Sequence, residues 1–458
     1  MTKNRKALKW TVIALAFLFL GVPLLLAAIN VFDEDLKPEA IAFADFSGEE
    51  VAPEENGYYA WVGLRAPVGE NPHARGVQIV AQVNEKLDML PREAVNTNTF
   101  FGAKALKLPN NLAGLCGRDA TGCLDRYRSK TSDIEKQVRE NKVLLERYRA
   151  LYRYPHFHET VKPRYYGPFF SDPAMVSGLA RAQHALQALR GDHQQALRQL
   201  RHDTLFWRQV LTDTRGLTNK MIAVAAIHRN AQLASEIVAH HPADKDTLAL
   251  AAQSVQPLTE WERDLTYVYR NEFGLVMHLL TTIPTEMSAP CPAESIYDCL
   301  IGKLTATFLF KSHATVNQSF ENFSEIAAKS RLPAPEFLKK TNERQASYQN
   351  FWDWLPPWHF AYNPIGKILN AIAVTPYDNY TARIHNLDGF MRLVSLSLAA
   401  RQQSVRDADM PALLARAQLN LRNPYTNDPM LWDAENRAFY FDGMGDDNLL
   451  GKRLEVRL

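Results

Sequence analysis

The longest uninterrupted hydrophobic segment of the chain lies near its N-terminus. Residues 10–31 read WTVIALAFLFLGVPLLLAAINV and contain no charged side chain. An α-helix of this length spans roughly 33 Å, enough for a bilayer core of about 30 Å. Basic side chains populate residues 1–9, whereas acidic residues follow the segment at Asp33, Glu34 and Asp35. Because basic flanks stay in the cytoplasm, this pattern predicts a single-pass transmembrane anchor with a cytoplasmic tail over residues 1–9.

Two other interpretations of residues 10–31 stay open. A cleaved signal peptide usually has an apolar core of only about 7–15 residues and an A-x-A-like cleavage site. Here Ala27 and Ala28 are followed by Ile29, and no Cys follows the segment directly to accept a lipid. A buried core helix would also be apolar on all sides. The length and the flanking charges favour an uncleaved anchor over both.

Beyond residue 56 the spacing of apolar side chains is mostly helical. One stripe with intervals of three, four and seven residues predicts an amphipathic helix over residues 123–152, namely Ile134, Val138, Leu145, Tyr148 and Tyr152. Three helices are expected between residues 172 and 241, with breaks near Gly191 and near residues 213–216, and others at 258–281, 295–330, 334–350 and 376–402. No fixed repeat recurs. The pattern predicts a mainly α protein with an irregular multi-helix body over residues 57–418.

The last segment, residues 419–458, has a different pattern. Short aromatic-rich runs alternate with turn residues such as Asn423-Pro424 and Asp428-Pro429, and the chain closes on the alternating sequence LEVRL. Such alternation between turns is typical of strands. It predicts a small C-terminal antiparallel β ribbon.

Composition narrows the possible functions. The chain has 52 basic and 50 acidic side chains, which argues against a nucleic-acid-binding protein because such proteins usually carry a basic excess. An apolar content of 46% fits a folded body. Residues 32–56 are rich in acidic side chains and contain Pro38 and Pro53, which predicts a solvated linker between the anchor and the body.

The four cysteines form two close pairs, Cys116 with Cys123 and Cys291 with Cys299. Beyond an export anchor, such pairs predict two short-loop disulfides. A zinc site is the alternative, but neither pair has CxxC spacing and no nearby His completes a set of four ligands. Disulfides and an N-in anchor together indicate a bacterial inner-membrane protein whose body lies in the periplasm.

The sequence contains no strong motif for catalysis, cofactor binding or metal binding. The chain has no GxSxG, GxGxxG or GxxxxGK[ST] sequence, and no cofactor is expected. His156, His158 and Glu159 are the nearest approach to a metal site, since two His two residues apart can share one side of an extended segment. Their Tyr and Pro neighbours favour a structural loop instead. Asn363-Pro364 is interpreted as a helix start, with Asn363 as the cap.

Three tryptophans, Trp352, Trp354 and Trp358, lie within the sequence FWDWLPPWHF. Their flat apolar faces could line a groove for a carbohydrate or a peptide. The other interpretation is a buried hinge between two helices, held by Pro356-Pro357. We favour the buried hinge, most of all for Trp352 and Trp354.

Several longer phrases resemble known proteins. They are FWRQVL and NKMIAVAAIHRN, NPIGKIL and YDNYTARIHNLDGFMRLVSLSL, and the terminal NPYTNDPMLWDAENRAFYF. Together they resemble large single-pass envelope proteins of proteobacteria that carry no assigned activity. The resemblance implies topology and no functional residues. The terminal phrase is also similar to the strand-and-turn end of type II secretion pseudopilins, although the anchor lacks the prepilin Gly cleavage site and the Glu that follows it.

The expected function is therefore that of a non-enzymatic scaffold or partner-binding component of the cell envelope. Its expected partners are the bilayer, through residues 10–31, and an envelope protein. One alternative is an envelope enzyme acting on cell-wall glycan or peptide, with the tryptophan segment as its groove. A secretion-system accessory protein is the other alternative.

Overall fold

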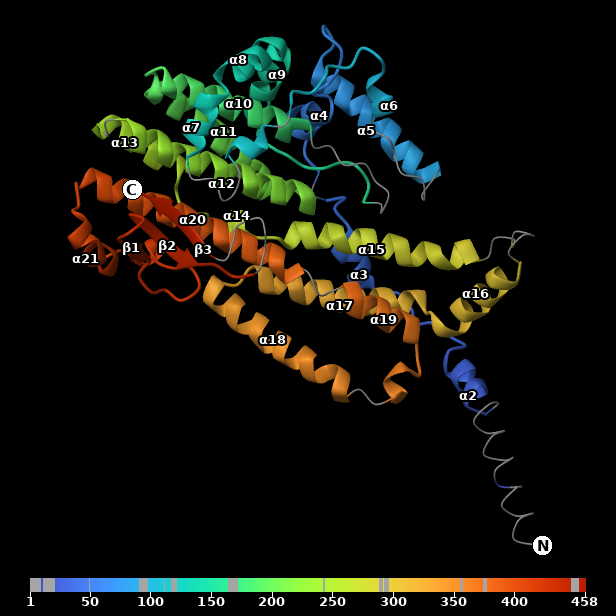
Figure 1. The fold of residues 1–458 in the computed structure, drawn as a ribbon. Coiled ribbons are helices and arrows are strands. Elements are labelled where there is room, and N and C mark those ends of the chain that lie inside the picture. The colour runs from blue at the N-terminus through green and yellow to red at the C-terminus, as the bar shows by residue number, and fades with distance from the viewer. Residues whose placement is uncertain are drawn as a thin grey trace. The chain divides into compact units, whose positions relative to one another are not determined.

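The computed structural model describes residues 10, 21–48, 50–89, 98–110, 112–116, 122–163, 172–241, 244–287, 291, 296–354, 357–373, 377–445 and 453–458. These residues are mainly helical, with a small antiparallel sheet at the C-terminus, as the sequence predicts (Figure 1). The chain divides into two compact units. Unit 1 comprises Met1–Asp45, Phe273–Glu325 and Asn342–Pro376, and unit 2 comprises Phe46–Glu272, Ile326–Thr341 and Tyr377–Leu458.

Long helices form the core of unit 2. They are α10 (Asp172–Leu189), α11 (His193–Asp213), α12 (Leu217–His240), α13 (Lys245–Ser254) and α20 (Tyr377–Gln402). Helix α12 packs against α11 and α20, and α11 also packs against α10 and α13. The break predicted near Gly191 is confirmed, because Gly191 has φ 95°, a conformation that glycine adopts without strain. The break predicted near residues 213–216 separates α11 from α12.

A buried polar cluster links these helices. The fully buried Asp203 of α11 accepts hydrogen bonds from the hydroxyls of Tyr148 and Tyr152 and from the amide of Asn230 in α12. Arg181 of α10 donates to the Asn230 carbonyl oxygen at 2.8 Å. Because a buried polar group is costly unless it is paired, these bonds hold the helices in one arrangement.

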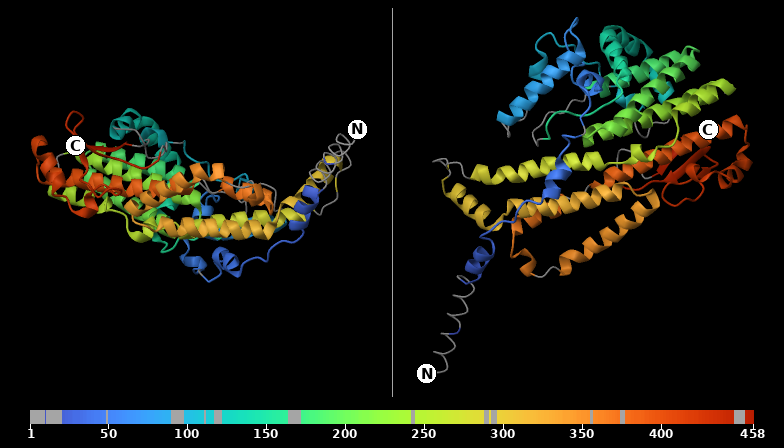
Figure 2. Two further views of the ribbon diagram at one scale, coloured as in Figure 1. Left: turned by 90° about the horizontal axis from the view of Figure 1, so that it is seen from below. Right: turned by 180° about the vertical axis from the view of Figure 1, so that it is seen from behind.

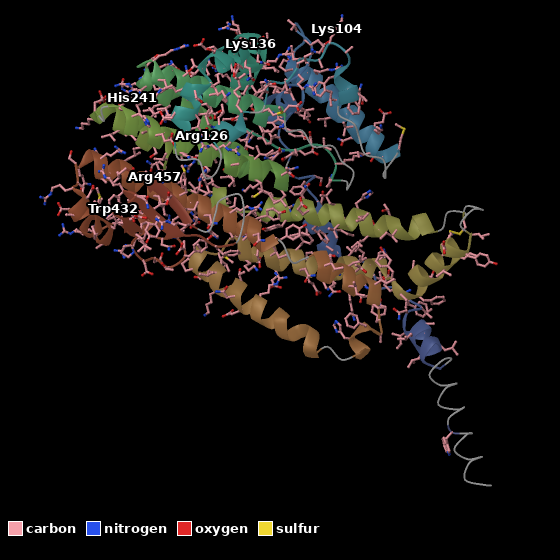
Figure 3. All side chains as sticks on the ribbon, in the orientation of Figure 1. Lys104, Arg126, Lys136, His241, Trp432 and Arg457 are labelled. Carbon is pink, nitrogen blue, oxygen red and sulfur yellow. A yellow bond between two sulfur atoms is a disulfide. The ribbon has the colours of Figure 1, made fainter. Side chains whose placement is uncertain are left out.

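Residues 123–150 form three short helices and not the single helix that the sequence predicts. They are α7 (Cys123–Ser129), α8 (Thr131–Glu140) and α9 (Lys142–Ala150). The predicted stripe is nevertheless buried at Ile134, Leu145 and Tyr148. The exposed Lys136, labelled in Figure 3, belongs to the opposite, polar side of α8. Apolar spacing continues across the breaks, so it does not reveal them.

Shorter elements surround the core of unit 2. They are η2 (Pro53–Glu55), α4 (Gly57–Val62), α5 (Pro72–Met89), α6 (Asn98–Phe101), η3 (Ala113–Cys116), η4 (Leu151–Arg153), α14 (Glu260–Arg263), η7 (Asp407–Asp409), α21 (Met410–Ala415) and η8 (Leu419–Leu421). Helix α4 packs on α5, and its fully buried Trp61 contacts the rings of Phe157 and Trp207. These contacts place the predicted loop after residue 153 over the helical core.

The predicted C-terminal ribbon is a three-stranded antiparallel sheet. Its strands are β1 (Leu431–Asp433), β2 (Ala438–Asp442) and β3 (Arg453–Arg457), in the order β1-β2-β3. Strands β2 and β3 pack on α20 (Figure 2). A Cβ atom at Gly389 of α20 would lie 2.2 Å from the ring of Phe441, so glycine allows this close approach.

Unit 1 contains helices from three parts of the chain. They are α2 (Val22–Ile29), α3 (Pro38–Ala44), α16 (Ile296–Leu309), η6 (Pro357–Phe360), α19 (Pro364–Ala373) and parts of α15 (Thr266–Met287), α17 (Ser312–Ser330) and α18 (Ala334–Trp354). In its interior, Phe43 meets the rings of Phe273 and Phe320 edge-on. The core of unit 1 therefore joins α3, α15 and α17.

The acidic segment after the predicted anchor is not a freely solvated linker, contrary to our expectation. The Asp33 carboxylate accepts hydrogen bonds from the backbone N–H groups of His313 and Ala314 at the start of α17. The backbone N–H of Lys37 donates to the Asn317 side chain, and α3 follows. The prediction failed because composition alone does not reveal that a carboxylate can satisfy the free N–H groups of a helix start.

Among the described residues, no helix is long and apolar enough to cross a membrane. Residues 11–20 of the predicted anchor and the cytoplasmic tail of residues 1–9 lie outside the described part of the chain. Helix α2 covers most of the described residues of the predicted anchor.

Candidate functional site

Glu159 of the HFHE segment, residues 156–159, accepts hydrogen bonds from the residues at the start of helix α12. Its Oε1 atom accepts hydrogen bonds from the Thr214 hydroxyl, the Gly216 N–H and the Asn219 amide. Its Oε2 atom accepts one from the Arg215 N–H at 2.6 Å. Both carboxylate oxygens therefore serve the N-terminus of α12, where a negative charge is favourable.

The two histidines of this segment lie side by side, with ring centroids 6.0 Å apart. The buried Asn56 fixes their loop, because its amide donates to the His158 carbonyl at 2.9 Å and its side-chain oxygen accepts from the His158 N–H. Within the described ranges, no group of three or more His, Cys, Asp or Glu side chains is arranged to hold a metal ion. The visible contacts of this segment are thus those of a structural loop.

The cysteines are paired as the sequence predicts. The Cα atoms are 4.8 Å apart in Cys116–Cys123 and 5.8 Å apart in Cys291–Cys299, within the usual range for disulfides. The first bond ties the end of η3 to the first residue of α7 in unit 2, and the second ties the segment before α16 to the first turn of that helix in unit 1.

The tryptophan groove stays a prediction. Trp352 and Trp354 belong to the last turn of α18, and Trp358 belongs to η6. Their side chains lie outside what the structure describes.

Unit 1 has an exposed apolar surface, whose parts on α16 and α19 were not among the sites expected from the sequence. It consists of Leu24, Leu25 and Ile29 on α2, Ile296, Tyr297, Leu300, Ile301 and Phe308 on α16, and Ile368, Leu369 and Ile372 on α19. Tyr297 is 80% exposed and Ile372 is 70% exposed. Helix α16 packs against both α2 and α19, so the three helices that carry these residues are neighbours. Large exposed apolar patches are uncommon on monomeric soluble proteins and are typical of interaction sites.

Helix α2 is fastened to this surface by one buried amide. Asn30 follows α2 and is fully buried. Its amide donates to the Ala361 carbonyl at 2.6 Å, and its side-chain oxygen accepts from the Asn363 N–H at 2.8 Å. Asn363 in turn accepts from the Gly366 N–H, which confirms it as the cap of α19. These hydrogen bonds therefore hold the end of α2 directly against the loop before α19, beside the apolar surface.

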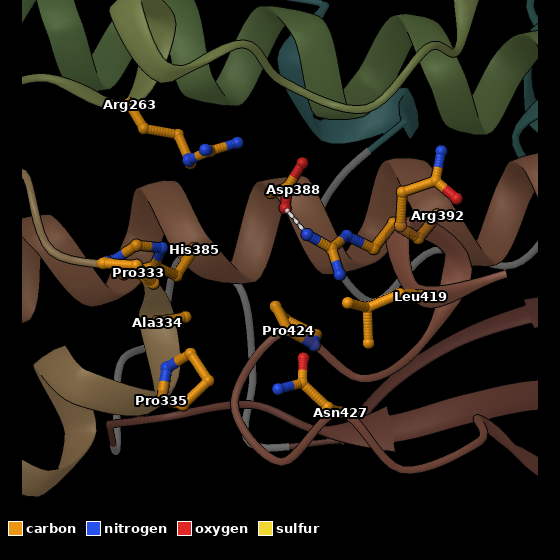
Figure 4. Close-up of a pocket in the computed structure, with 11 residues that line it drawn as sticks. Arg263, Pro333, Ala334, Pro335, His385, Asp388, Arg392, Leu419, Pro424 and Asn427 are labelled. Carbon is orange, nitrogen blue, oxygen red and sulfur yellow. Dashed lines mark hydrogen bonds and ion pairs between the residues drawn. The ribbon is translucent and has the colours of Figure 1, made fainter.

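Unit 2 contains a pocket of about 430 Å³ (Figure 4). Helix α20 contributes His385, Asp388 and Arg392, whose spacing of three and four residues places them on one helical face. Arg263 reaches the pocket from the end of α14. The other lining residues are Pro333, Ala334, Pro335, Leu419, Asn420, Pro424 and Asn427.

The charges of the pocket are unbalanced. The buried Asp388 carboxylate pairs with Arg392 at 2.6 Å and accepts a hydrogen bond from the Leu258 N–H. Burial, together with the positive charges of Arg263 and Arg392, lowers the pKa of His385 to about 3, so this imidazole is neutral near pH 7. Two guanidinium groups thus face one carboxylate.

The spacing of His385, Asp388 and Arg392 along one helix was a sequence signal that could have pointed to this pocket. Arg263 is far from α20 in the sequence, so the periodicity of either segment alone does not bring them together. In comparisons of the chain with protein-family models, curated proteins and solved structures, none matches. The functional argument therefore depends on the geometry of this chain.

Proposed function

We propose that the protein is a membrane-anchored scaffold of the bacterial cell envelope, with unit 1 resting on the outer surface of the inner membrane. The apolar surface of α2, α16 and α19 carries this proposal. It lies where the chain emerges from the predicted anchor, and Asn30 ties the end of α2 to the loop before α19.

The bilayer is the occupant that best suits this surface. Fully burying a Leu or Ile side chain gains about 1.5–3 kcal/mol. Insertion of several side chains of α16 and α19 into the bilayer would therefore remove them from water with a large gain in free energy. Helices that present apolar faces in this way lie in the interface plane, between headgroups and acyl chains. Because α16 packs on α2, an anchor that continues α2 would bring α16 to that depth.

The scaffold role is supported by how the polar groups of the body are used. The Asp203 cluster and the Glu159 carboxylate are engaged in hydrogen bonds between helices. Such groups stabilise an arrangement of helices, and exposed surfaces of unit 2 are then available to an envelope protein partner.

Reporter fusions test the topology. Alkaline phosphatase fused after Leu458 should be active, because the C-terminus is expected in the periplasm, and the same enzyme fused after Arg5 should be inactive. A cytoplasmic reporter that is active at the C-terminus would overturn both the proposed topology and the compartment.

Cross-linking in intact cells tests the scaffold role. The full chain should be recovered joined to one defined envelope protein, with the linked peptides on unit 2. Quantitative recovery of the chain without any linked protein would contradict a scaffold and favour the alternative of an envelope enzyme.

A further inference from the structure

The pocket of unit 2 holds an unused positive charge. Arg263 donates one N–H to the Leu258 carbonyl, and none of the described carboxylates pairs with it. Arg392 shares its charge with Asp388 and donates to the Arg422 carbonyl at 3.0 Å. The wall of the pocket therefore has a net charge of about +1 while His385 is neutral.

Hydrogen-bonding capacity is also unused there. The Nε atom of Arg392 and the Nε2 atom of His385 are buried and have no hydrogen-bond partner among the residues that the structure describes. His385 as a whole is only 2% exposed. Buried donors without partners are uncommon in native proteins, and a bound molecule can supply the partner that the chain itself lacks.

The remaining walls are apolar. Pro333, Pro335 and Leu419 line the pocket together with Pro424, whereas Asn420 and Asn427 add amide groups. A volume of about 430 Å³ falls within the range of small-molecule sites. It would admit a compact organic molecule that has both a charged and an apolar part.

We propose that this pocket binds a small organic anion. Its carboxylate or phosphate group would lie against the guanidinium of Arg263, with Arg392 beside it. The planar fork of a guanidinium matches the two oxygens of either group. The apolar part of the ligand would lie against Pro335 and Leu419. A neutral His385 adds hydrogen-bonding capacity without a further charge.

Four probe molecules of similar shape distinguish the effect of ligand charge on binding from the effect of ligand shape. They are benzoate, phenyl phosphate, the neutral benzamide and the cationic benzylammonium ion. Binding is measured by calorimetry on the full chain in lipid nanodiscs, with empty nanodiscs as the blank. We expect at least one of the two anions to bind at least tenfold more tightly than benzamide, and benzylammonium not to bind. Preference between the two anions then identifies a carboxylate or a phosphate ligand.

A charge-matched pair of variants locates the site. Arg263→Gln should weaken binding of the better anion by about tenfold or more, because a charge-assisted hydrogen bond is lost. Arg263→Lys keeps the charge without the fork and should bind with intermediate affinity. The control is Arg198→Gln on α11, which makes the same charge change at an exposed side chain whose hydrogen bond within the described part of the chain is to Gln195. It should bind like the wild type.

Several results would overturn the proposal. They are equal binding of benzamide and benzoate, equal effects of Arg263→Gln and Arg198→Gln, and no binding of either anion at 10 mM, roughly the concentration at which even weak sites fill. If Arg263→Gln does not fold, the comparison of anion binding by Arg263→Lys and by the control Arg198→Gln tests the proposal instead. None of these results bears on the apolar surface of unit 1, so the proposed function is tested separately.

Discussion

Glu159 belongs to the HFHE segment, residues 156–159, which in the sequence was the nearest approach to a metal site. Its two oxygens instead accept hydrogen bonds from the start of α12, including the N–H groups of Arg215 and Gly216. Asp33 does the same for α17. A carboxylate at a helix start is stabilised both by hydrogen bonds and by the helix dipole, so these residues serve the fold.

Glu159→Ala should therefore destabilise the protein by about 2–3 kcal/mol, because several charge-assisted hydrogen bonds are lost. Glu159→Gln keeps one acceptor oxygen and should cost less. Urea unfolding of the two variants measures the difference. Wild-type stability should not change with a chelator, and a fall in melting temperature on adding one would favour a metal site.

Glu272 should make the stability of the folded protein fall as the pH rises. Burial raises its pKa to about 7, although the Tyr377 hydroxyl donates to it at 3.4 Å. Between its ordinary pKa of 4.5 and this value, the folded state keeps a proton that the unfolded state releases. Rising pH through this window therefore lowers stability, and the loss is complete above pH 7.

Glu272→Gln tests this effect because it removes the titrating group and keeps the shape. Relative to the wild type, the variant should gain stability between pH 5 and pH 8, roughly the window set by the two pKa values. The measurement is the free energy of unfolding of both proteins at each pH. A difference that does not change with pH would show that Glu272 is ionised in the folded protein throughout.

At the scale of elements, the sequence predicts a helix best where backbone chemistry marks its ends. Gly191 separates α10 from α11, and Asn363-Pro364 begins α19. The break at Lys130 carries no such residue, and Asn141 at the next break makes no side-chain N-cap hydrogen bond. The apolar stripe runs across both breaks. Periodicity reports which face is buried and not where the backbone turns.

The sites were harder to predict than the elements. The pocket joins Arg263 to residues of α20, and the apolar surface joins α2 to helices beyond residue 295. Both depend on packing between distant segments. An exposed apolar stripe on α16 has the same period as a buried one, so the sequence alone does not distinguish them.

The disulfide Cys291–Cys299 should hold the start of α16, and with it part of the apolar surface. Replacing both cysteines by Ser should cost roughly 2–3 kcal/mol of local stability on the loop-entropy model. Hydrogen exchange should become faster in α16 and remain unchanged in α12. The matched control replaces Cys116 and Cys123 in unit 2. Equal protection of α16 with and without its disulfide would contradict this role.

At the scale of the whole molecule, the connection between the predicted anchor and the rest of unit 1 is short. Asn30, Asp33 and Lys37 all bond to other segments of unit 1, so the chain has little slack after α2. A solvated linker would let unit 1 move away from the bilayer. This connection would instead keep the apolar surface of α2, α16 and α19 at the membrane.

Lipid quenching of a fluorescent label tests that claim directly. The native cysteines are paired, so a single introduced cysteine can be labelled at Ile301 or Ile372 on the apolar surface, which are 62% and 70% exposed. An exposed site in the same unit, Glu325 of α17, is the control. In nanodiscs that contain a lipid-attached quencher, labels at Ile301 and Ile372 should be strongly quenched and the label at Glu325 should not. Equal quenching at the three sites, or none, would contradict a membrane-facing unit 1.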